Sequence, residues 1–327
     1  MSETIRWAII GTGSIASKFA TGLQELPDAT LQAVGSRSQD RADEFGDEYD
    51  APERFGSYRE LAQSSSTDII YIATPHPFHH DNTLLCLRAG KPVLCEKPFA
   101  VNAAQAEEMV QCARERDLFC MEGMWTRFFP LMDDVRSILA NGDIGEPRML
   151  QVDFGFRIGW EPESRLLNPD LAGGSLLDVG IYCCALSSMI FGDPTDLAGL
   201  AHIGETGVDE EAGWVLKHDD GQIAVCSSAV RTGTPMEAVI NGTDGRITIH
   251  SPWWIPTSMT VEKGDSDPET LDFPLQGNGM NYEAAEVMNC LRNGKTEHEI
   301  MPLDETLRIA GTMDSLREEW GLEYPFE

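Results

Sequence analysis

Positive charge is the scarcest feature of this sequence. Asp and Glu number 54 against 24 Lys and Arg, which gives a formal net charge of −30 over 327 residues. Lysine is especially rare and occurs only at positions 18, 91, 97, 217, 263 and 295. Such an acidic surface repels the phosphates of nucleic acids and anionic membranes, so we exclude nucleic acid as a partner.

The carboxylates are spread along the chain and form no acidic tail. This distribution predicts a solvated protein surface and argues against a disordered segment. Scattered carboxylates with little lysine are also typical of adaptation to high salt, which we state as a hypothesis about habitat. An ordinary acidic protein is the alternative.

Other absences narrow the class of protein further. None of the eight cysteines forms a CxxC pair, so neither a zinc ribbon nor a thioredoxin site is predicted, and reduced buried thiols are expected. We expect no apolar run long enough to span a bilayer, and the N-terminal residues pass directly into a strand pattern without the apolar segment of a signal peptide. We therefore expect a cytoplasmic protein with no membrane partner.

The pattern of apolar residues divides the chain near Gly123. Before it, short apolar runs alternate with amphipathic stretches, which predicts a parallel sheet covered by helices on both faces. After it, consecutive strand-like segments with hairpin signals at Asp220-Gly221 and Asp244-Gly245 predict a mainly antiparallel sheet. Helices are expected at 130–141, 175–191, about 281–293 and 304–320. The predicted fold is an α/β domain at 1–123 followed by an α+β domain at 124–327.

A glycine-rich turn lies between the first predicted strand and the first predicted helix. Gly11-Thr12-Gly13-Ser14-Ile15-Ala16 fits the dinucleotide-binding pattern G-x-G-x-x-G/A of the Rossmann fold. Gly11 permits the tight turn, Gly13 lets the pyrophosphate approach the backbone, and Ala16 permits close helix–strand packing. The free N–H groups at the helix N-terminus favour an anion there.

The end of the second predicted strand bears on which dinucleotide binds. An NAD site usually has Asp or Glu at this point, whereas this chain has Ser36-Arg37-Ser38. Arg37 can pair with a 2′-phosphate and stack on adenine, the serines can donate hydrogen bonds, and Arg41 is a second candidate cation. We therefore predict NADP as the cofactor.

A catalytic set is predicted from three residues in two segments. Lys97 follows the fourth strand, between Glu96 and Pro98, at the carboxyl edge where open α/β sheets bind ligands. Asp178 and Tyr182 are four residues apart in a helical pattern and so share one face. With Lys97 as the neighbouring cation, Tyr182 is a candidate for proton transfer.

Two other clusters have less specific interpretations. His76, His79 and His80 lack a carboxylate spaced to complete a metal site, so no metal is predicted. Trp253-Trp254 can line a sugar pocket, because aromatic faces pack on the CH surfaces of sugars, or can equally belong to a core or an interface.

The motifs together resemble the Gfo/Idh/MocA family of oxidoreductases over nearly the whole chain. The resemblance rests on the glycine-rich loop, Ala73-Thr74-Pro75 followed by His79, the Glu96-Lys97-Pro98 segment and Asp178-Val179-Gly180. Most members have His at the position of Tyr182. Tyrosine there, and the segment 122–130, EGMWTRFFP, resemble the branch of dihydrodiol dehydrogenases and NADP-dependent D-xylose dehydrogenases.

The resemblance implies roles for individual residues. Lys97 and Tyr182 are then catalytic and Asp178 supports the substrate, while Thr74, Pro75 and His79 lie near the nicotinamide ribose. The expected cofactor-binding residues are Gly11, Gly13, Ser14, Ile15, Ser36, Arg37, Ser38, Arg41, Thr74, Pro75, His79, Glu96, Lys97, Trp125 and Arg127. The expected substrate residues are Trp125, Phe154, Asp178, Tyr182 and Trp254.

The implied reaction is oxidation at C1 of an aldopyranose, D-xylose first, to the lactone. Tyr182, with its phenolate favoured by Lys97, takes the hydroxyl proton while hydride passes to NADP. Family members commonly form dimers through the open face of the second domain's sheet, so a homodimer or higher homo-oligomer is expected. The alternatives are a trans-dihydrodiol dehydrogenase, a dicarbonyl or anhydro-sugar reductase, and a catalytically silent NADP-binding regulator.

Overall fold

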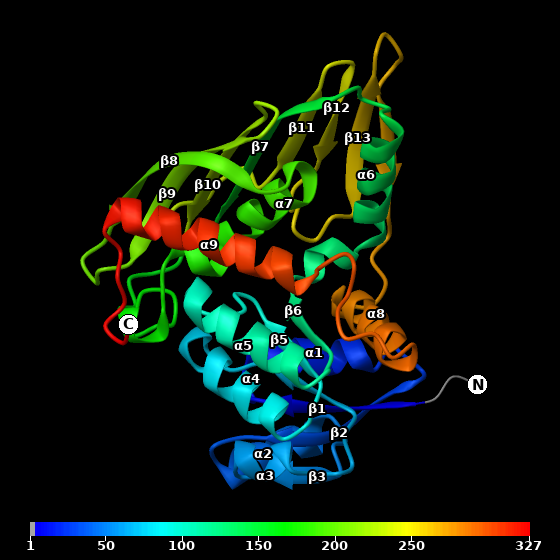
Figure 1. The fold of residues 1–327 in the computed structure, drawn as a ribbon, viewed down its shortest axis with the longest axis vertical. Helices are drawn as coiled ribbons and strands as arrows, with labels where there is room; N and C mark the ends of the chain where they lie inside the picture. Colours follow the sequence, from blue (N-terminus) through cyan, green and yellow to red (C-terminus); the bar gives the residue numbers. More distant parts are fainter. Residues whose placement is uncertain (1–3) are drawn as a thin grey trace. The chain divides into compact units, whose positions relative to one another are not determined.

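The computed structural model describes residues 4–327, and their contacts form two compact units (Figure 1). Unit 1 comprises the described residues through Phe128 together with Leu275–Leu307, and unit 2 comprises Phe129–Pro274 together with Arg308–Glu327. The predicted division near Gly123 therefore differs from the structure in one respect, because residues 275–307 return to unit 1. Their helix α8 (Met280–Arg292) packs against α1 (Ser14–Leu23) at Gly22, where a Cβ would make tight contacts of 3.0–3.2 Å with residues 278–281.

Unit 1 has a six-stranded sheet in the order β3-β2-β1-β4-β5-β6, and every pairing in it is parallel, as predicted. Its strands are β1 (Ile5–Ile10), β2 (Ala29–Gly35), β3 (Glu53–Phe55), β4 (Ile69–Ile72), β5 (Val93–Glu96) and β6 (Cys120–Gly123). Its other helices are α2 (Gln39–Glu48), α3 (Tyr58–Ala62), α4 (His79–Arg88) and α5 (Ala103–Glu115), with short 3₁₀ turns η1 (His76–Phe78) and η2 (Trp125–Phe128). The short elements β3 and α3 carry too few residues for a periodic signal and were not predicted.

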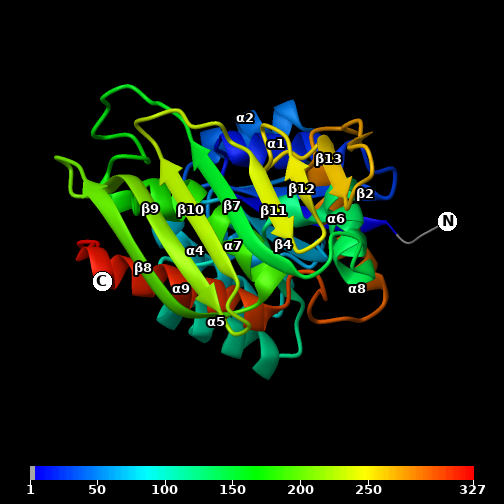
Figure 2. The same cartoon turned by 90° about the horizontal axis from the view of Figure 1, so that it is seen from above.

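Unit 2 has an eight-stranded sheet in the order β14-β13-β12-β11-β7-β10-β9-β8, and Figure 2 shows strands of this sheet side by side. The strands are β7 (Pro147–Gly155), β8 (Pro194–Ile203), β9 (Asp209–His218), β10 (Ile223–Ala229), β11 (Ala238–Gly242), β12 (Gly245–Ile249), β13 (Ser258–Lys263) and β14 (Glu269–Asp272). The predicted hairpins at 220–221 and 244–245 connect β9 to β10 and β11 to β12. The pairing of β10 with β7 is parallel, so the sheet is mixed but mainly antiparallel, as expected.

One face of this sheet carries the core of unit 2. Along β9, Ala212, Trp214 and Leu216 are buried, while the intervening side chains point to the opposite face, as the strand period of two requires. The ring centroid of Trp214 lies 6.2 Å from that of Trp320, at the end of α9 (Leu303–Trp320). Helix α9 begins in unit 1 and ends in unit 2. Helices α6 (Pro130–Asn141) and α7 (Ile181–Phe191) also belong to unit 2.

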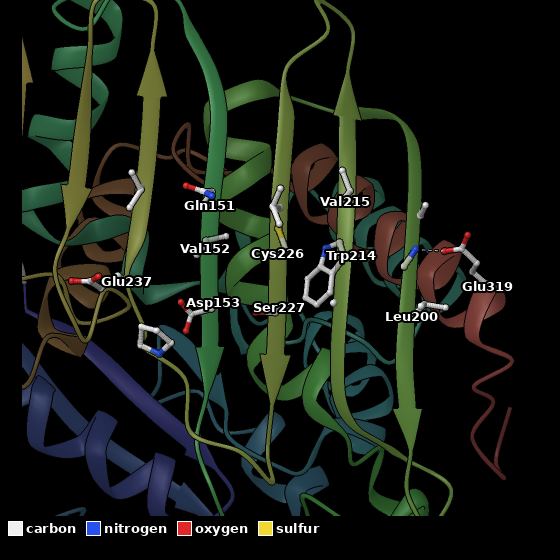
Figure 3. Close-up of a pocket in the computed structure, with 16 residues that line it drawn as sticks. Gln151, Val152, Asp153, Leu200, Trp214, Val215, Cys226, Ser227, Glu237 and Glu319 are labelled. Carbon is white, nitrogen blue, oxygen red and sulfur yellow. Dashed lines mark hydrogen bonds between the residues drawn. The ribbon is translucent and has the colours of Figure 1, made fainter. Parts of the chain in front are cut away.

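The opposite face of the sheet is open. A cavity of about 890 Å³ lies on this face and is lined by residues of β7, β8, β9, β10 and β11. Figure 3 shows the residues that line it. Leu200 is 84% exposed on this face, and Val215 and Val225 are 39% and 40% exposed. At the edge strand β8, the N–H of Gly199 donates a hydrogen bond of 2.8 Å to a carboxylate oxygen of Glu319.

The segment 169–191 corrects one expectation. By length and composition this 23-residue segment is apolar enough to span a bilayer, although no such run was predicted. In the structure 78% of its apolar window is buried inside the protein, which is the behaviour of a core helix. It contains η3 (Pro169–Leu171), the π-helical η4 (Leu176–Gly180) and α7.

Candidate active site

The glycine-rich turn has the backbone geometry that its sequence predicts. Gly11 has φ +103°, and a Cβ there would lie 2.7 Å from the carbonyl oxygen of Ala73 at the end of β4. Only glycine fits both conditions. Ala16 is completely buried, and no heavy atom lies within 4 Å of the Cβ position at Gly13 just before α1. The N-terminus of α1, with Ser14 exposed and Ile15 half-buried, therefore offers an open cradle for a pyrophosphate.

The residues after β2 lie at the same end of the parallel sheet as the turn, because the pairing of β1 with β2 is parallel. The guanidinium of Arg37 lies over the exposed ring of Phe78, 5.8 Å from its centroid. Ser36 is buried and its hydroxyl oxygen accepts the N–H of Ser38 at 3.4 Å. Arg41 is exposed and pairs with Glu44 at 3.4 Å. Arg37 is thus the better placed cation for a 2′-phosphate.

His79 joins the end of β4 to the loop after β5. Its ring nitrogens lie 2.7 Å from the carbonyl oxygens of Thr74 and Pro98, and the residue is 1% exposed. Burial lowers the pKa of this imidazole. The structure places Pro75 at the exposed end of β4 and His79 behind it, where it supports the loop.

The loop after β5 is held by hydrogen bonds to buried carboxylates. The peptide bond between Lys97 and Pro98 is cis. The N–H of Lys97 donates to Oε2 of Glu96 at 3.1 Å, and the hydroxyl of Tyr71 donates to the other carboxylate oxygen. The N–H of Phe99 donates to Glu122 at 2.9 Å. Burial raises the pKa of Glu122 to about 7.

Two predicted cofactor residues in the segment after β6 differ in their exposure to solvent. Trp125 is half-buried at the start of η2, whereas the side chain of Arg127 is 3% exposed. Arg127 forms a 2.6 Å ion pair with Glu305 and donates to the carbonyl oxygen of Ile300 at 3.0 Å. The charge of Arg127 is therefore balanced inside unit 1.

In unit 2 the predicted pair lies where a π-helix passes into an α-helix. Asp178 belongs to η4 and Tyr182 to the first turn of α7, and both are buried. A π-helical turn within a helix often marks a functional site. Oδ1 of Asp178 accepts a hydrogen bond from Nη1 of Arg165 at 2.7 Å.

The start of this helix is fixed by a buried carboxylate from β9. Asp209 accepts hydrogen bonds from the hydroxyl of Ser175 at 2.8 Å and from the N–H of Leu176 at 2.6 Å. A Cβ at Gly174 would lie 2.0 Å from its Oδ1, which explains the glycine before the helix. Burial raises the pKa of Asp209 to about 6.

Aromatic side chains surround Tyr182. Its ring centroid lies 5.4 Å from that of Phe154, which stacks on Trp254 at 3.8 Å. The neighbouring Trp253 is 1% exposed and donates to the carbonyl oxygen of Asp153 at 2.7 Å, so it belongs to the core. The sequence allowed a sugar pocket, a core or an interface for both tryptophans. The structure shows that their surroundings differ, because Trp253 lies in the core and Trp254 stacks on Phe154.

Two family models match the chain. Residues 5–124 match the model described as the oxidoreductase family with an NAD-binding Rossmann fold, and residues 132–248 match the Gfo/Idh/MocA C-terminal domain. The trans-1,2-dihydrobenzene-1,2-diol dehydrogenase of Mus musculus is 40% identical over 330 residues, which cover 98% of each chain. The human enzyme of the same name is also 40% identical, over 338 residues and 98% of each chain.

The chain belongs to the Gfo/Idh/MocA family of oxidoreductases. Its match to the NAD-binding model and to dehydrogenases over full length makes it an NAD(P)-dependent oxidoreductase of the sugar and dihydrodiol dehydrogenase type. The family resemblance and the predicted fold class are thus confirmed.

Solved structures agree with this fold. The 3-ketoreductase KijD10 from Actinomadura kijaniata, in complex with NADP and TDP-benzene, has a TM-score of 0.86 and 25% identity and covers 97% of this chain and 98% of its own. The aldose-aldose oxidoreductase from Caulobacter crescentus has a TM-score of 0.87 at 24% identity, with 97% of each chain covered.

The structure adds residues that the motifs did not identify. Arg165, Asp209 and Glu283 each lie in contact with, or next to, a predicted site segment, yet they come from elsewhere in the chain. A charged residue within an apolar helical or strand pattern, as at Asp209 and Glu283, is the signal that a search of the sequence offers for such positions.

Proposed function

We propose that this protein is an NADP-dependent dehydrogenase that oxidises a secondary alcohol on a six-membered ring bearing vicinal hydroxyl groups, with a trans-dihydrodiol as the first substrate class. The environment of Tyr182 carries the proposal, because a phenol suited to proton transfer lies beside the ring of Phe154, which in turn stacks on Trp254. Aromatic faces of this kind suit a flat or ring-shaped apolar surface. The 40% identity to dihydrodiol dehydrogenases over full length supports the diol.

The cofactor proposal rests on the end of β2. The cradle before α1 fits a pyrophosphate, and Arg37 stands where an NAD site usually has an acidic residue. When bound, NADP supplies the hydride acceptor. A guanidinium held over Phe78 is suited to pair with the 2′-phosphate, since arginine binds phosphate through several parallel hydrogen bonds.

The protein's own residues then have separate tasks. Tyr182 accepts the proton of the hydroxyl group that is oxidised, so the carbinol carbon becomes a carbonyl as it loses its hydride. Lys97 supplies positive charge that favours the ionised phenol and orients the hydroxyl. Asp178, kept charged by Arg165, accepts a hydrogen bond from the vicinal hydroxyl.

An aldopyranose such as D-xylose, oxidised at C1 to the lactone, is the second candidate. The segment 122–130 resembles a branch that contains both dihydrodiol and D-xylose dehydrogenases, and the same aromatic faces pack on sugar CH groups. A silent NADP-binding regulator remains the alternative from another class.

The test is the initial rate of NADP reduction with trans-1,2-dihydrobenzene-1,2-diol, D-xylose, D-glucose and L-arabinose, at low and molar KCl. We expect kcat/KM for the diol to be at least about tenfold higher than for any aldose, because the substrates differ by one or two hydrogen bonds that the site can form with them. A preference for D-xylose would transfer the proposal to the sugar. No turnover at either salt concentration, with tight NADPH binding, would refute a dehydrogenase and favour the regulator.

We also propose a homodimer formed through the open face of the unit 2 sheet. The family resemblance suggests it, and the exposed Leu200, Val215 and Val225 give that face an apolar centre. Leu200→Glu is expected to convert the dimer to a monomer in light scattering, with Thr195→Glu at the same strand as a control. A wild-type monomer would contradict this proposal.

A further inference from the structure

Glu283 is a buried acid that the proposed reaction does not use. It lies on α8 in unit 1 with 0% exposure, and neither carboxyl oxygen has a hydrogen-bond partner within residues 4–327. An isolated ionised carboxylate is very costly in such a place. A buried polar group without a partner therefore calls for an explanation in terms of function or charge state.

The position of Glu283 links it to the Lys97 loop. A Cβ built on Gly123 of β6 would lie 3.5 Å from Cα of Glu96 and 3.7 Å from Oε2 of Glu283, so Glu283 reaches the end of β5. Glu96 is 4% exposed and receives the hydroxyl of Tyr71 and the N–H of Lys97, which are bonds to a carboxylate acceptor. The two glutamates thus form a buried acidic pair directly before Lys97.

The elements that pack against α8 carry few cations. Helix α8 packs on α1 and η2, whose cations are Lys18, which is exposed, and Arg127, which is buried. Arg127 is paired with Glu305 at 2.6 Å, and the acid on the neighbouring strand β6 is Glu122. The groups that face Glu283 from the sheet are Glu96 and Tyr71.

When two buried carboxyl groups lie close together, the repulsion between their charges favours the state in which one of them is protonated. Burial, with the charge of Glu96 in addition, keeps the pKa of Glu283 well above its usual range. The neutral form of Glu283 leaves Glu96 as the charged member, which is the form that accepts both hydrogen bonds.

We propose that Glu283 is a positioning residue for Lys97, acting through Glu96. As a neutral acid it allows Glu96 to hold the backbone of Lys97. Its ionisation adds a like charge that weakens the hydrogen bond between Glu96 and Lys97 and disorders the loop. This inference rests on the proposed function only for the role of Lys97 in turnover.

The variants Glu283→Gln and Glu283→Ala test the inference, with Glu107→Gln on the exposed face of α5 as the matched control. Glutamine keeps the shape and remains neutral at any pH. We expect it to move the alkaline limb of kcat/KM upward by about one pH unit or more, since the like charge no longer forms. Glu107→Gln is expected to keep the wild-type limb. Coincident limbs in the wild type and Glu283→Gln would overturn the proposal.

A second measurement does not require turnover. Acylation of Lys97 is followed across pH by peptide mass spectrometry, with the exposed Lys217 of unit 2 as the internal reference. The ratio of the two labelling rates is expected to show a step at alkaline pH in the wild type, to lack that step in Glu283→Gln, and to be altered at all pH values in Glu283→Ala. A protein that turns over no substrate yet shows this pattern would refute the proposed function alone. Identical ratios in the wild type and Glu283→Gln would refute the role of Glu283 alone.

Discussion

Arg165 and Asp178 form an ion pair of 2.7 Å in which the carboxylate is 6% exposed and the guanidinium 54% exposed. The arginine comes from the loop before the helix and approaches the carboxylate from the solvent side. Because the carboxylate is the buried partner, removal of the arginine takes an opposite charge away from a desolvated group. Arg165 therefore favours the ionised form of Asp178, which can accept a hydrogen bond from a substrate hydroxyl.

Arg165→Met is expected to lower kcat/KM by about 10- to 100-fold, through loss of a hydrogen bond from a half-exposed guanidinium to a buried carboxylate. Arg165→Lys should recover part of the loss, because it restores the charge but not the fork geometry. Arg157→Met, an exposed position of the same loop, is the control. Steady-state kinetics that give the same kcat/KM for Arg165→Met and Arg157→Met would disprove the role.

Tyr182→Phe is expected to lower kcat by about 10²–10⁴-fold, which is the usual contribution of a positioned acid or base. The change removes only the hydroxyl group, so the ring contact with Phe154 and the affinity for NADPH should be retained. Rates of NADP reduction and NADPH fluorescence titrations measure the two effects. Tyr49→Phe, whose ring packs on Phe45 in unit 1, is the control, and a kcat for Tyr182→Phe equal to that control would refute proton transfer by Tyr182.

Arg37→Asp is expected to raise the Michaelis constant for NADP by about 10- to 100-fold, because a hydrogen bond to a charged group contributes about 1.5–3 kcal/mol. The constant for NAD should change little or fall, since an acidic residue suits the ribose hydroxyls. Arg41→Asp is the control, as its guanidinium is already engaged with Glu44. Equal changes for the two cofactors at Arg37 would exclude a 2′-phosphate site there.

Those parts of the fold and site that depend on neighbouring residues were predictable. The turn at Gly11, the parallel strands of unit 1 and the hairpin at Asp244-Gly245 follow from short patterns, because their geometry is set by a few adjacent residues. The Lys97-Pro98 segment was located by the same kind of local signal. The D-xylose substrate was inferred from a resemblance, and it stays a prediction.

Features that depend on distant contacts were not predictable. The return of 275–307 to unit 1 depends on the packing of α8 against α1, which no local pattern reveals. The π-helical start before Tyr182 is held by Asp209, 31 residues further from Asp178 along the chain. A period of hydrophobic residues predicts that a helix exists, but a distant side chain determines where and how it begins.

Asp209→Asn should change the dependence of stability on pH. The folded-state pKa of Asp209 is about 6, above the ordinary value of 3.8 for an aspartic acid, so folding favours the protonated form. Its stabilising contribution is therefore complete below about pH 4 and is lost as pH rises to about 6, by at most about 3 kcal/mol. Asparagine can still accept the bonds from Ser175 and Leu176 but cannot ionise. Urea unfolding at pH 4 to 7 should show a smaller loss of unfolding free energy across this range in the variant than in the wild type, and parallel curves would contradict the buried, ionising Asp209.

Salt should stabilise this protein beyond ordinary screening. A net charge of −30 with 54 acidic residues produces repulsion between exposed carboxylates in the folded state. The Debye length falls from about 10 Å at 0.1 M salt to about 3 Å at 1 M, so simple screening is nearly complete at 1 M. We expect the melting temperature to rise steeply up to that concentration and to go on rising in KCl above it, as adaptation to high salt requires. A rise that stops once screening is complete would indicate an ordinary acidic protein, and a melting temperature independent of KCl would show that the acidic surface places no strain on the fold.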